Sequence, residues 1–156
     1  MNATEAIEYI HSVCWKGSIP GLGRTQALLE KMGNPEKKLK FVHIAGTNGK
    51  GSTAAMTASI LRKAGYRTGL YTSPYIYRFH ERMQVDGLEI TDEELSEITE
   101  YVKPLAESLK EAPTEFELVC CIAFEYFVRK QCDIVVLEVG MGGAFDATNV
   151  IETPEV

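Results

Sequence analysis

The chain has 156 residues, a formal net charge of −6, 45% hydrophobic residues and 24% charged residues, which is the balance of an ordinary globular protein. The negative charge argues against a nucleic-acid surface, which needs clustered lysine and arginine, but it does not exclude a small anionic ligand. No apolar run approaches the roughly 20 residues that span a bilayer, and the first residues carry two glutamates and no basic segment of a signal peptide. We therefore expect one cytoplasmic domain that binds neither nucleic acid nor membrane.

The cysteines do not form a metal-binding or redox pattern. None of the four is spaced as C-x-x-C, and two of them are adjacent in the chain: Cys14, Cys120, Cys121 and Cys132. Buried, reduced thiols are favoured over a metal site or a disulfide.

The first half of the chain alternates helical and extended patterns. Apolar residues at helical spacing predict a helix that begins near Asn2 or Thr4 and runs to about residue 13, followed by a loop rich in glycine and proline, from Gly17 to Gly23. A short helix is predicted over 25–33 and a compact strand over 39–46. A helix over 52–64 is expected to pack through Ala55, Met56, Ile60 and Leu61, and to end at Gly65.

The second half continues this alternation. A strand is predicted over 66–73, an irregular segment with a tight turn at Asp86-Gly87 follows, and a Thr91–Glu94 capping box opens a helix that Pro104 should kink or break. A helix over 115–131 and a buried strand over 132–140 complete the pattern. We predict an α/β fold with a doubly wound, mainly parallel sheet and flanking helices. Three clear strands are few for this class, so we expect residues 1–156 to be an N-terminal piece of a longer protein.

A glycine-rich turn separates the strand over 39–46 from the following helix. In "HIAGTNGKGST", glycines surround Lys50, so successive backbone N–H groups can turn inward around an anion while the helix N-terminus adds further donors. Lys50 would supply a full charge for the outer phosphates. The alternative is a plain turn with a surface lysine, which the flanking strand and helix patterns disfavour.

The loop departs from the G-x-x-x-x-G-K-[ST] pattern, because Gly51 follows the lysine and the usual metal-holding hydroxyl is missing there. Ser52 or Thr53 could serve instead, or the metal could be held elsewhere. Ser73 and Glu138 are candidates, since both lie near strand ends, where ligands bind in open α/β sheets. A magnesium ion would compensate a buried Glu138. The alternatives are a salt bridge for Glu138 and a simple turn position for Ser73.

Four motifs together carry a family resemblance: "HIAGTNGKGST", "YTSPY", "RFHERM" and "LEVGMGGAFDATN". From about Gly21 onward the chain resembles folylpolyglutamate synthase and bifunctional dihydrofolate synthase, members of the ATP-dependent Mur ligase superfamily. The resemblance implies that residues 1–156 form the N-terminal part of the ATP-binding domain, with the rest of that domain and a C-terminal domain beyond Val156. A further metal-binding histidine, a modified lysine and the glutamate-binding domain would lie there as well.

The resemblance also implies roles for individual residues. ATP would bind at Gly46, Thr47, Asn48, Gly49, Lys50, Gly51 and Ser52, with Lys50 as the catalytic residue. Magnesium would bind at Ser73 and Glu138. The pterin-bearing substrate would lie near Gly21, Leu22, Gly23, Thr114, Glu115, Phe116, Glu117, Phe145, Asp146 and Ala147. Two of these assignments have bland alternatives, since "TEFE" reads equally well as an ordinary helix start and Asp146 as a helix cap.

The chain departs from the family's usual spelling at two positions. Ala144 stands where bacterial members often have arginine, a pattern that resembles the eukaryotic enzymes, and Tyr75 stands in place of the usual histidine. The histidines are not expected to act as acid–base catalysts. His43 is expected to be packed and His11 to lie on a helix surface or interface, whereas His80 sits in a charged loop that is either solvated or part of a binding site.

The activity implied by the resemblance is ATP-dependent addition of L-glutamate to a folate or dihydropteroate carboxylate through an acyl phosphate. Partners would be these small molecules, and the parent protein is expected to be a monomer. A cell-wall Mur ligase is a rival, which "GKGS" and "GGAFDATN" disfavour. A nucleotide-binding module without catalysis is the rival for the chain by itself. A switch GTPase would need an N-K-x-D motif, which the sequence lacks.

Overall fold

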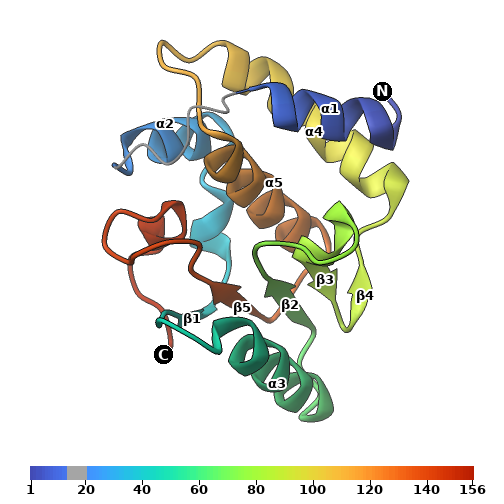
Figure 1. Ribbon diagram of the computed structural model, residues 1–156, viewed down its shortest axis with the longest axis vertical. Coiled ribbons are helices and arrows are strands. Elements are labelled where there is room, and N and C mark those ends of the chain that lie inside the picture. The colour runs from blue at the N-terminus through green and yellow to red at the C-terminus, as the bar shows by residue number, and fades with distance from the viewer. Residues whose placement is uncertain (14–20) are drawn as a thin grey trace.

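The structure, a computed structural model, describes residues 1–13 and 21–156. It is built on a five-stranded mixed sheet in the order β1-β5-β2-β3-β4 (Figure 1). These strands are β1 (Phe41–Ile44), β2 (Thr68–Tyr71), β3 (Met83–Val85), β4 (Leu88–Glu89) and β5 (Ile134–Glu138). Three positions with sequence predictions lie outside the described residues: the loop residues Gly17 and Pro20, and Cys14, which was expected to be a buried thiol.

The three strands expected from the sequence form the parallel part of the sheet. β5 lies in the middle and pairs in parallel with β1 on one side and β2 on the other. β3 and β4 add an antiparallel hairpin beyond β2. The hairpin turns at Asp86 and Gly87, whose φ angles of 52° and 82° are those that a tight two-residue turn requires. The α/β class and the Asp86-Gly87 turn are thus confirmed, while the two short hairpin strands were not predicted individually.

Helices cover the sheet unequally. On one side lie α1 (Ala3–Ser12), α2 (Gly23–Lys31), α4 (Asp92–Glu107) and α5 (Glu115–Arg129), whereas α3 (Lys50–Lys63) lies on the other (Figure 1). Three short 3-10 helices are η1 (Pro35–Lys38), η2 (Phe79–Arg82) and η3 (Ala147–Val150). The core lies between the sheet and the larger group of helices, where α5 is buried over most of its length.

The prediction of which residues form the buried face of α3 is wrong. Met56 and Ile60 are 60% and 69% exposed, whereas Ala54 is fully buried. The helix packs against β2 and β5 and buries Ala54, while Ala55 is exposed and Leu61 is half-buried. Helical spacing favoured the large apolar residues, but Met56 and Ile60 lie on the exposed side of the helix.

The remaining helices follow the sequence more closely. The Thr91–Glu94 capping box begins α4 as predicted. Pro104 does not break this helix, which continues to Glu107. Cys120, Cys121 and Cys132 are buried and unpaired, as expected, and burial raises the pKa of each thiol above its ordinary value. Within the described residues, no helix combines the length and apolar character required to cross a membrane.

The sheet packs closely on α5 at Gly69, in β2. A Cβ atom at this position would lie 2.7 Å from Cδ1 of Phe127 and 3.1 Å from Cγ2 of Val135, both of which are fully buried. We expect Gly69→Ala to lower the free energy of unfolding by about 1–3 kcal/mol, since neither side chain has room to move. Thermal melting measures the change. In the control Gly23→Ala, a Cβ atom meets nothing within 4 Å, so an equal loss of stability there would contradict this explanation.

Candidate functional site

The carboxyl ends of the three parallel strands bring the predicted phosphate loop and the predicted metal ligands to one edge of the sheet. Ile44, the last residue of β1, pairs with Glu138, the last residue of β5. Tyr71 ends β2 and pairs with Leu137. The loop that follows β1, the Ser73 that follows β2 and the carboxylate of Glu138 therefore converge, as expected for a ligand site in an open α/β sheet.

The glycine loop leads directly into α3. Gly49 adopts a left-handed conformation, with φ of 77°, which glycine accommodates at little cost, and α3 begins at the next residue, Lys50. No side chain caps the first turn of α3, so its backbone N–H groups remain available to an anion. The Nζ atom of Lys50 donates a hydrogen bond of 2.9 Å to the carbonyl oxygen of Gly46. The lysine thus folds back over the loop, where its charge lies beside these donors.

Glu138 lies buried against the start of α3. Glu138 is 5% exposed, and its Oε2 atom accepts a hydrogen bond of 3.0 Å from the backbone N–H of Ser73. A Cβ atom on Gly51 would lie 3.5 Å from Oε1 of Glu138, so the glycine brings the first turn of the helix close to the carboxylate. The positive end of the helix dipole favours a negative charge at this place.

The surroundings of Glu138 fit a divalent cation. Among the described residues, Glu138 forms no ion pair with a lysine or arginine, so the salt-bridge alternative is not supported. One N–H donor does not balance a buried carboxylate. Magnesium binds oxygen ligands, takes only one or two from the protein and fills its remaining positions with water and phosphate oxygens. Glu138 and the adjacent Ser73, beside the candidate phosphate loop, offer oxygen atoms of this kind.

A second polar cluster joins the starts of α2 and α5. Arg24 donates two hydrogen bonds to Glu117, one of 3.0 Å from Nε to Oε2 and one of 2.8 Å from Nη2 to Oε1. Oε2 of Glu117 also accepts the backbone N–H of Thr114 at 2.7 Å, while the Thr114 hydroxyl accepts the N–H of Glu117. The ordinary-helix-start interpretation of "TEFE" therefore describes Thr114 and Glu117 well, and Glu117 is occupied by internal partners.

Aromatic packing links this cluster to the strand-end site. The ring of Phe116 lies so close to Gly140 that a Cβ atom there would be 2.4 Å from the ring. Its centroid is 6.2 Å from that of Tyr71 at the end of β2. The start of α5 therefore lies against the loop that follows β5. Gly140 has to be a glycine for this contact, which explains the first glycine of "VGMGG" but not the pair that follows Met141.

Asp146 holds the loop after β5 together. Its Oδ2 atom accepts the N–H of Met141 at 2.8 Å, and Oδ1 accepts both the N–H and the hydroxyl of Thr148. The Thr148 hydroxyl lies 2.9 Å from Nε2 of His43. Burial lowers the pKa of His43, although the nearby Asp146 opposes this shift, so the ring is neutral at pH 7. The helix-cap interpretation of Asp146 is thus the one that the contacts support, and His43 is packed as expected.

The predicted substrate residues are brought to one region, although their side chains differ in access. These residues lie in three segments, 21–23, 114–117 and 145–147. The Arg24–Glu117 pair joins α2, which begins at the first segment, to α5, which begins at the second, and α2 also contacts η3 in the third. Phe145 is 71% exposed and Gly23 is exposed, whereas Ala147 is buried. The carboxylate of Glu115 lies 3.2 Å from Nδ1 of His11 on α1. Exposed positions such as Phe145 can touch a ligand directly, whereas buried ones such as Ala147 cannot.

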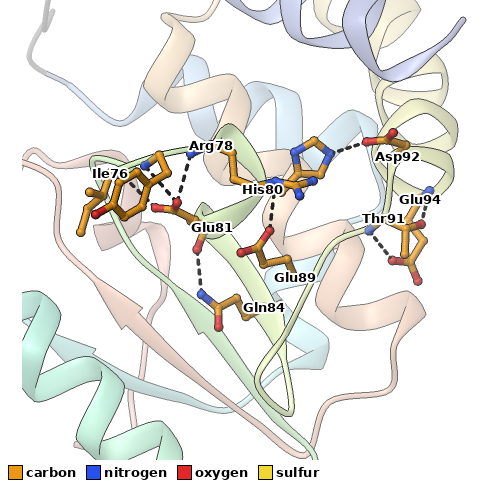
Figure 2. A network of polar contacts seen from close by, with 10 residues as sticks. Ile76, Arg78, His80, Glu81, Gln84, Glu89, Thr91, Asp92 and Glu94 are labelled. Atoms are coloured by element: carbon orange, nitrogen blue, oxygen red, sulfur yellow. Dashed lines mark hydrogen bonds and ion pairs between the residues drawn. The ribbon is translucent and has the colours of Figure 1, made fainter.

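The loop that carries Ser73 has an internal polar network (Figure 2). Glu81 gathers three backbone N–H groups of this loop, and Arg78 pairs with Glu89 at 3.2 Å. His80 is 6% exposed, and its Nε2 atom lies 2.8 Å from Asp92 at the start of α4, so this histidine is not in a solvated loop. The guanidinium of Arg82 lies 5.3 Å from the ring centroid of Tyr75.

Sequence reasoning missed the partners of the predicted residues. Arg24 lies next to the predicted Gly23, and Thr148 lies two residues after Asp146, but no local pattern indicates that either is used. Their partners are 93 and 105 residues away along the chain. In the sequence, Glu81 is one of the charged residues around His80. Its spacing of three residues from Arg78, which allows the carboxylate to reach back to the loop, was a usable signal.

We expect Glu117→Gln to lower the free energy of unfolding by about 1–3 kcal/mol, because the partly buried guanidinium of Arg24 would lose the carboxylate that accepts two of its hydrogen bonds, while the helix cap would persist. Urea unfolding measures this loss. Glu107→Gln is the control, since Glu107 pairs with Lys103 across 4.0 Å on the surface of α4 and should cost less than about 0.5 kcal/mol. Equal stability of both variants would show that the Arg24–Glu117 pair does not hold α2 against α5.

The comparisons agree with this architecture, although no protein-family model matches the chain. The chain is 46% identical over 153 residues to the dihydrofolate synthase/folylpolyglutamate synthase of Bacillus subtilis, a match covering 95% of the chain and 36% of that protein. It is 41% identical over 161 residues to the folylpolyglutamate synthase of Lacticaseibacillus casei, a match covering 100% of the chain and 37% of the relative.

Solved structures give the same result. An FPGS–AMPPCP–folate complex matches 99% of the chain and 38% of its own length, with a TM-score of 0.93 and 42% identity. A folylpolyglutamate synthase from Thermotoga maritima matches 97% of the chain and 36% of its own length, with a TM-score of 0.90. The chain thus spans a little over a third of the length of the relatives that it matches. In sequence and in fold, it belongs to the folylpolyglutamate synthase/dihydrofolate synthase family.

Proposed function

We propose that residues 1–156 form the N-terminal part of the ATP-binding domain of a ligase that adds L-glutamate to a folate or dihydropteroate carboxylate. One observation carries the proposal: the Lys50 loop and the buried Glu138 carboxylate meet at the same edge of the sheet. A phosphate loop beside a carboxylate that lacks a cationic partner among the described residues suits a magnesium nucleotide. The solved relative in complex with AMPPCP and folate supports the choice of ATP and a folate.

ATP would lie with its phosphates over the loop from Gly46 to Ser52. The N–H groups of the loop and of the first turn of α3 would donate to the phosphate oxygens, and Lys50 would move from the carbonyl of Gly46 to the outer phosphates. Lys50 is the proposed catalytic residue, because a charge held there stabilises the phosphoryl group in transfer.

Ser73 and Glu138 would hold magnesium, which neutralises phosphate charge when it is bound. This assignment accounts for the absence of a metal-binding hydroxyl at Gly51. The ligands that the loop lacks would come instead from the ends of β2 and β5. Gly51 leaves space for the carboxylate beside the first turn of α3.

The proposed reaction forms an amide from a carboxylate, which is too poor an electrophile to react directly with an amine. The substrate carboxylate oxygen attacks the γ-phosphorus of ATP, the bond to the β-phosphate oxygen breaks, and ADP leaves an acyl phosphate behind. The amine of glutamate then attacks the acyl carbon and phosphate departs. The protein contributes alignment and charge neutralisation.

The folate or dihydropteroate is proposed to lie near the starts of α2 and α5 and the loop around Phe145, where the exposed aromatic ring is available to it. Because the chain spans a little over a third of its relatives, nucleotide binding is the property to test on the chain itself, and we expect no turnover from it alone. The proposed setting is the cytoplasm, with small molecules as partners.

The first test is calorimetric titration with ATP in the presence of magnesium. We expect saturable binding by the chain and a loss of at least about tenfold in affinity for Lys50→Ala, since a charge-assisted contact to phosphate is removed. Lys63→Ala is the matched control, because Lys63 lies in the last turn of the same helix, away from the loop. Equal losses in the two variants would mean that Lys50 contributes only general charge.

A second titration tests the metal assignment. We expect Glu138→Gln to abolish the gain in ATP affinity that magnesium provides, while binding without magnesium changes little, because glutamine can accept the N–H of Ser73 but is a poor ligand for a hard cation. Titrations with and without the metal separate the two effects. A full magnesium-dependent gain in this variant would remove Glu138 from the proposed metal site.

A further inference from the structure

One carboxylate accepts three backbone N–H groups of the Ser73–Arg78 segment. Oε2 of Glu81 accepts the backbone N–H of Ile76 at 2.7 Å, and Oε1 accepts those of Tyr77 at 2.9 Å and Arg78 at 3.0 Å (Figure 2). Hydrogen bonds from these N–H groups, that of Ile76 most of all, lower the pKa of the Glu81 carboxyl below its ordinary value. Glu81 is therefore an ionised acceptor at neutral pH.

The same residue holds the other end of the segment through its backbone. The carbonyl oxygen of Glu81 accepts the hydroxyl of Thr72 at 3.4 Å, and the next carbonyl, that of Arg82, accepts the N–H of Thr72 at 3.1 Å. Ser73 thus lies between two anchored stretches, with Thr72 before it and residues 76–78 after it. Both anchors are on Glu81 and its neighbour.

Packing holds the segment at Tyr75, whose ring centroid lies 6.1 Å from that of Phe79, but not at the two residues that follow. Ile76 and Tyr77 are 80% and 91% exposed, so their side chains bury little surface that could fix the backbone. Glu81 itself lies in η2, where the neighbouring His80 is buried with its Nε2 atom 2.8 Å from Asp92 of α4. Gln84 of β3 donates a hydrogen bond of 3.1 Å from Nε2 to the Glu81 carbonyl oxygen (Figure 2). The carboxylate is therefore a fixed point to which an exposed segment is attached.

We infer that Glu81 is a positioning residue for the metal site: it keeps Ser73 where its N–H reaches Glu138. The link to Ser73 is short, because Ser73 N donates to Oε2 of Glu138 at 3.0 Å from between the two anchors. The inference rests on the proposed function in one respect only, namely that Ser73 and Glu138 serve a magnesium nucleotide. The structural part, that Glu81 orders Ser73, stands independently.

The experiment uses Glu81→Gln in the chain and two measurements. Glutamine keeps the size of the side chain but replaces one accepting oxygen with an NH₂ group, which opposes the N–H groups of residues 76–78. Amide hydrogen exchange, followed by NMR, should become faster by about tenfold or more at Ile76, Tyr77, Arg78 and Ser73. Calorimetric titration should show about tenfold weaker ATP binding with magnesium, and unchanged binding without it.

Two further variants separate positioning from general destabilisation. Glu89→Gln removes a charge that touches the same loop, but the Arg78–Glu89 pair is largely exposed, with side chains 59% and 36% accessible, and this variant should leave both measurements unchanged. Glu81→Asp keeps the charge and should recover part of the protection and part of the magnesium effect. If thermal melting shows that Glu81→Gln does not fold, Glu81→Asp carries the test, with intermediate exchange rates expected at the same four amides.

The outcomes distinguish the inference from the proposed function. Faster exchange at Ser73 together with a selective loss of magnesium-dependent binding supports the inference. Unchanged exchange at Ser73 in a folded variant overturns it, whatever the nucleotide does. If the unaltered chain binds no ATP, the proposed function fails for the chain, and the exchange rates alone decide whether Glu81 orders Ser73.

Discussion

The buried carboxylate of Glu138 is the constraint on which the site depends. It lies at the end of β5, the middle of the three parallel strands, and a group of this kind is costly to bury without donors or a cation. The structure meets part of the cost with the N–H of Ser73 and with the positive end of α3, which approaches closely because Gly51 has no side chain. In the proposed function, a magnesium ion would meet the rest. Strand order therefore matters, since only β5 borders both the loop after β1 and the turn after β2.

Two supporting layers surround this point. On one flank, Glu81 orders the exposed segment after Ser73 through backbone hydrogen bonds. On the other, Asp146 and Phe116 fasten the loop after β5 to η3 and α5, and the Arg24–Glu117 pair fastens α5 to α2. Several of these residues are charged, but their charged groups bind partners within the protein. A carboxylate that accepts two or three N–H groups shapes the site and does not need to touch a ligand to matter.

Much of this arrangement could be predicted, because its local causes are strong. The alternation of strands and helices, the Asp86-Gly87 turn and the Thr91–Glu94 capping box all follow from short-range rules, and the structure has each of them. The failures have a common cause. The face of α3 was assigned to Met56 and Ile60 on spacing, yet the sheet selects the small Ala54, and Pro104 was expected to disturb a helix that continues to Glu107. In both cases packing against neighbours outweighed a local preference.

The sequence by itself indicated the candidate phosphate loop, the three parallel strands and the candidate metal ligands Ser73 and Glu138, because glycine spacing, apolar runs and strand ends are local features of a sequence. It left open whether Glu138 is paired with a cationic residue, whether Asp146 caps a helix and what the charged residues around His80 do. Only the tertiary structure decided these points, since each depends on which groups meet across the fold. Arg24 and Glu117 are separated by 93 residues, and Ser73 and Glu138 by 65. Such contacts arise from strand order and helix packing, which no single stretch of sequence specifies.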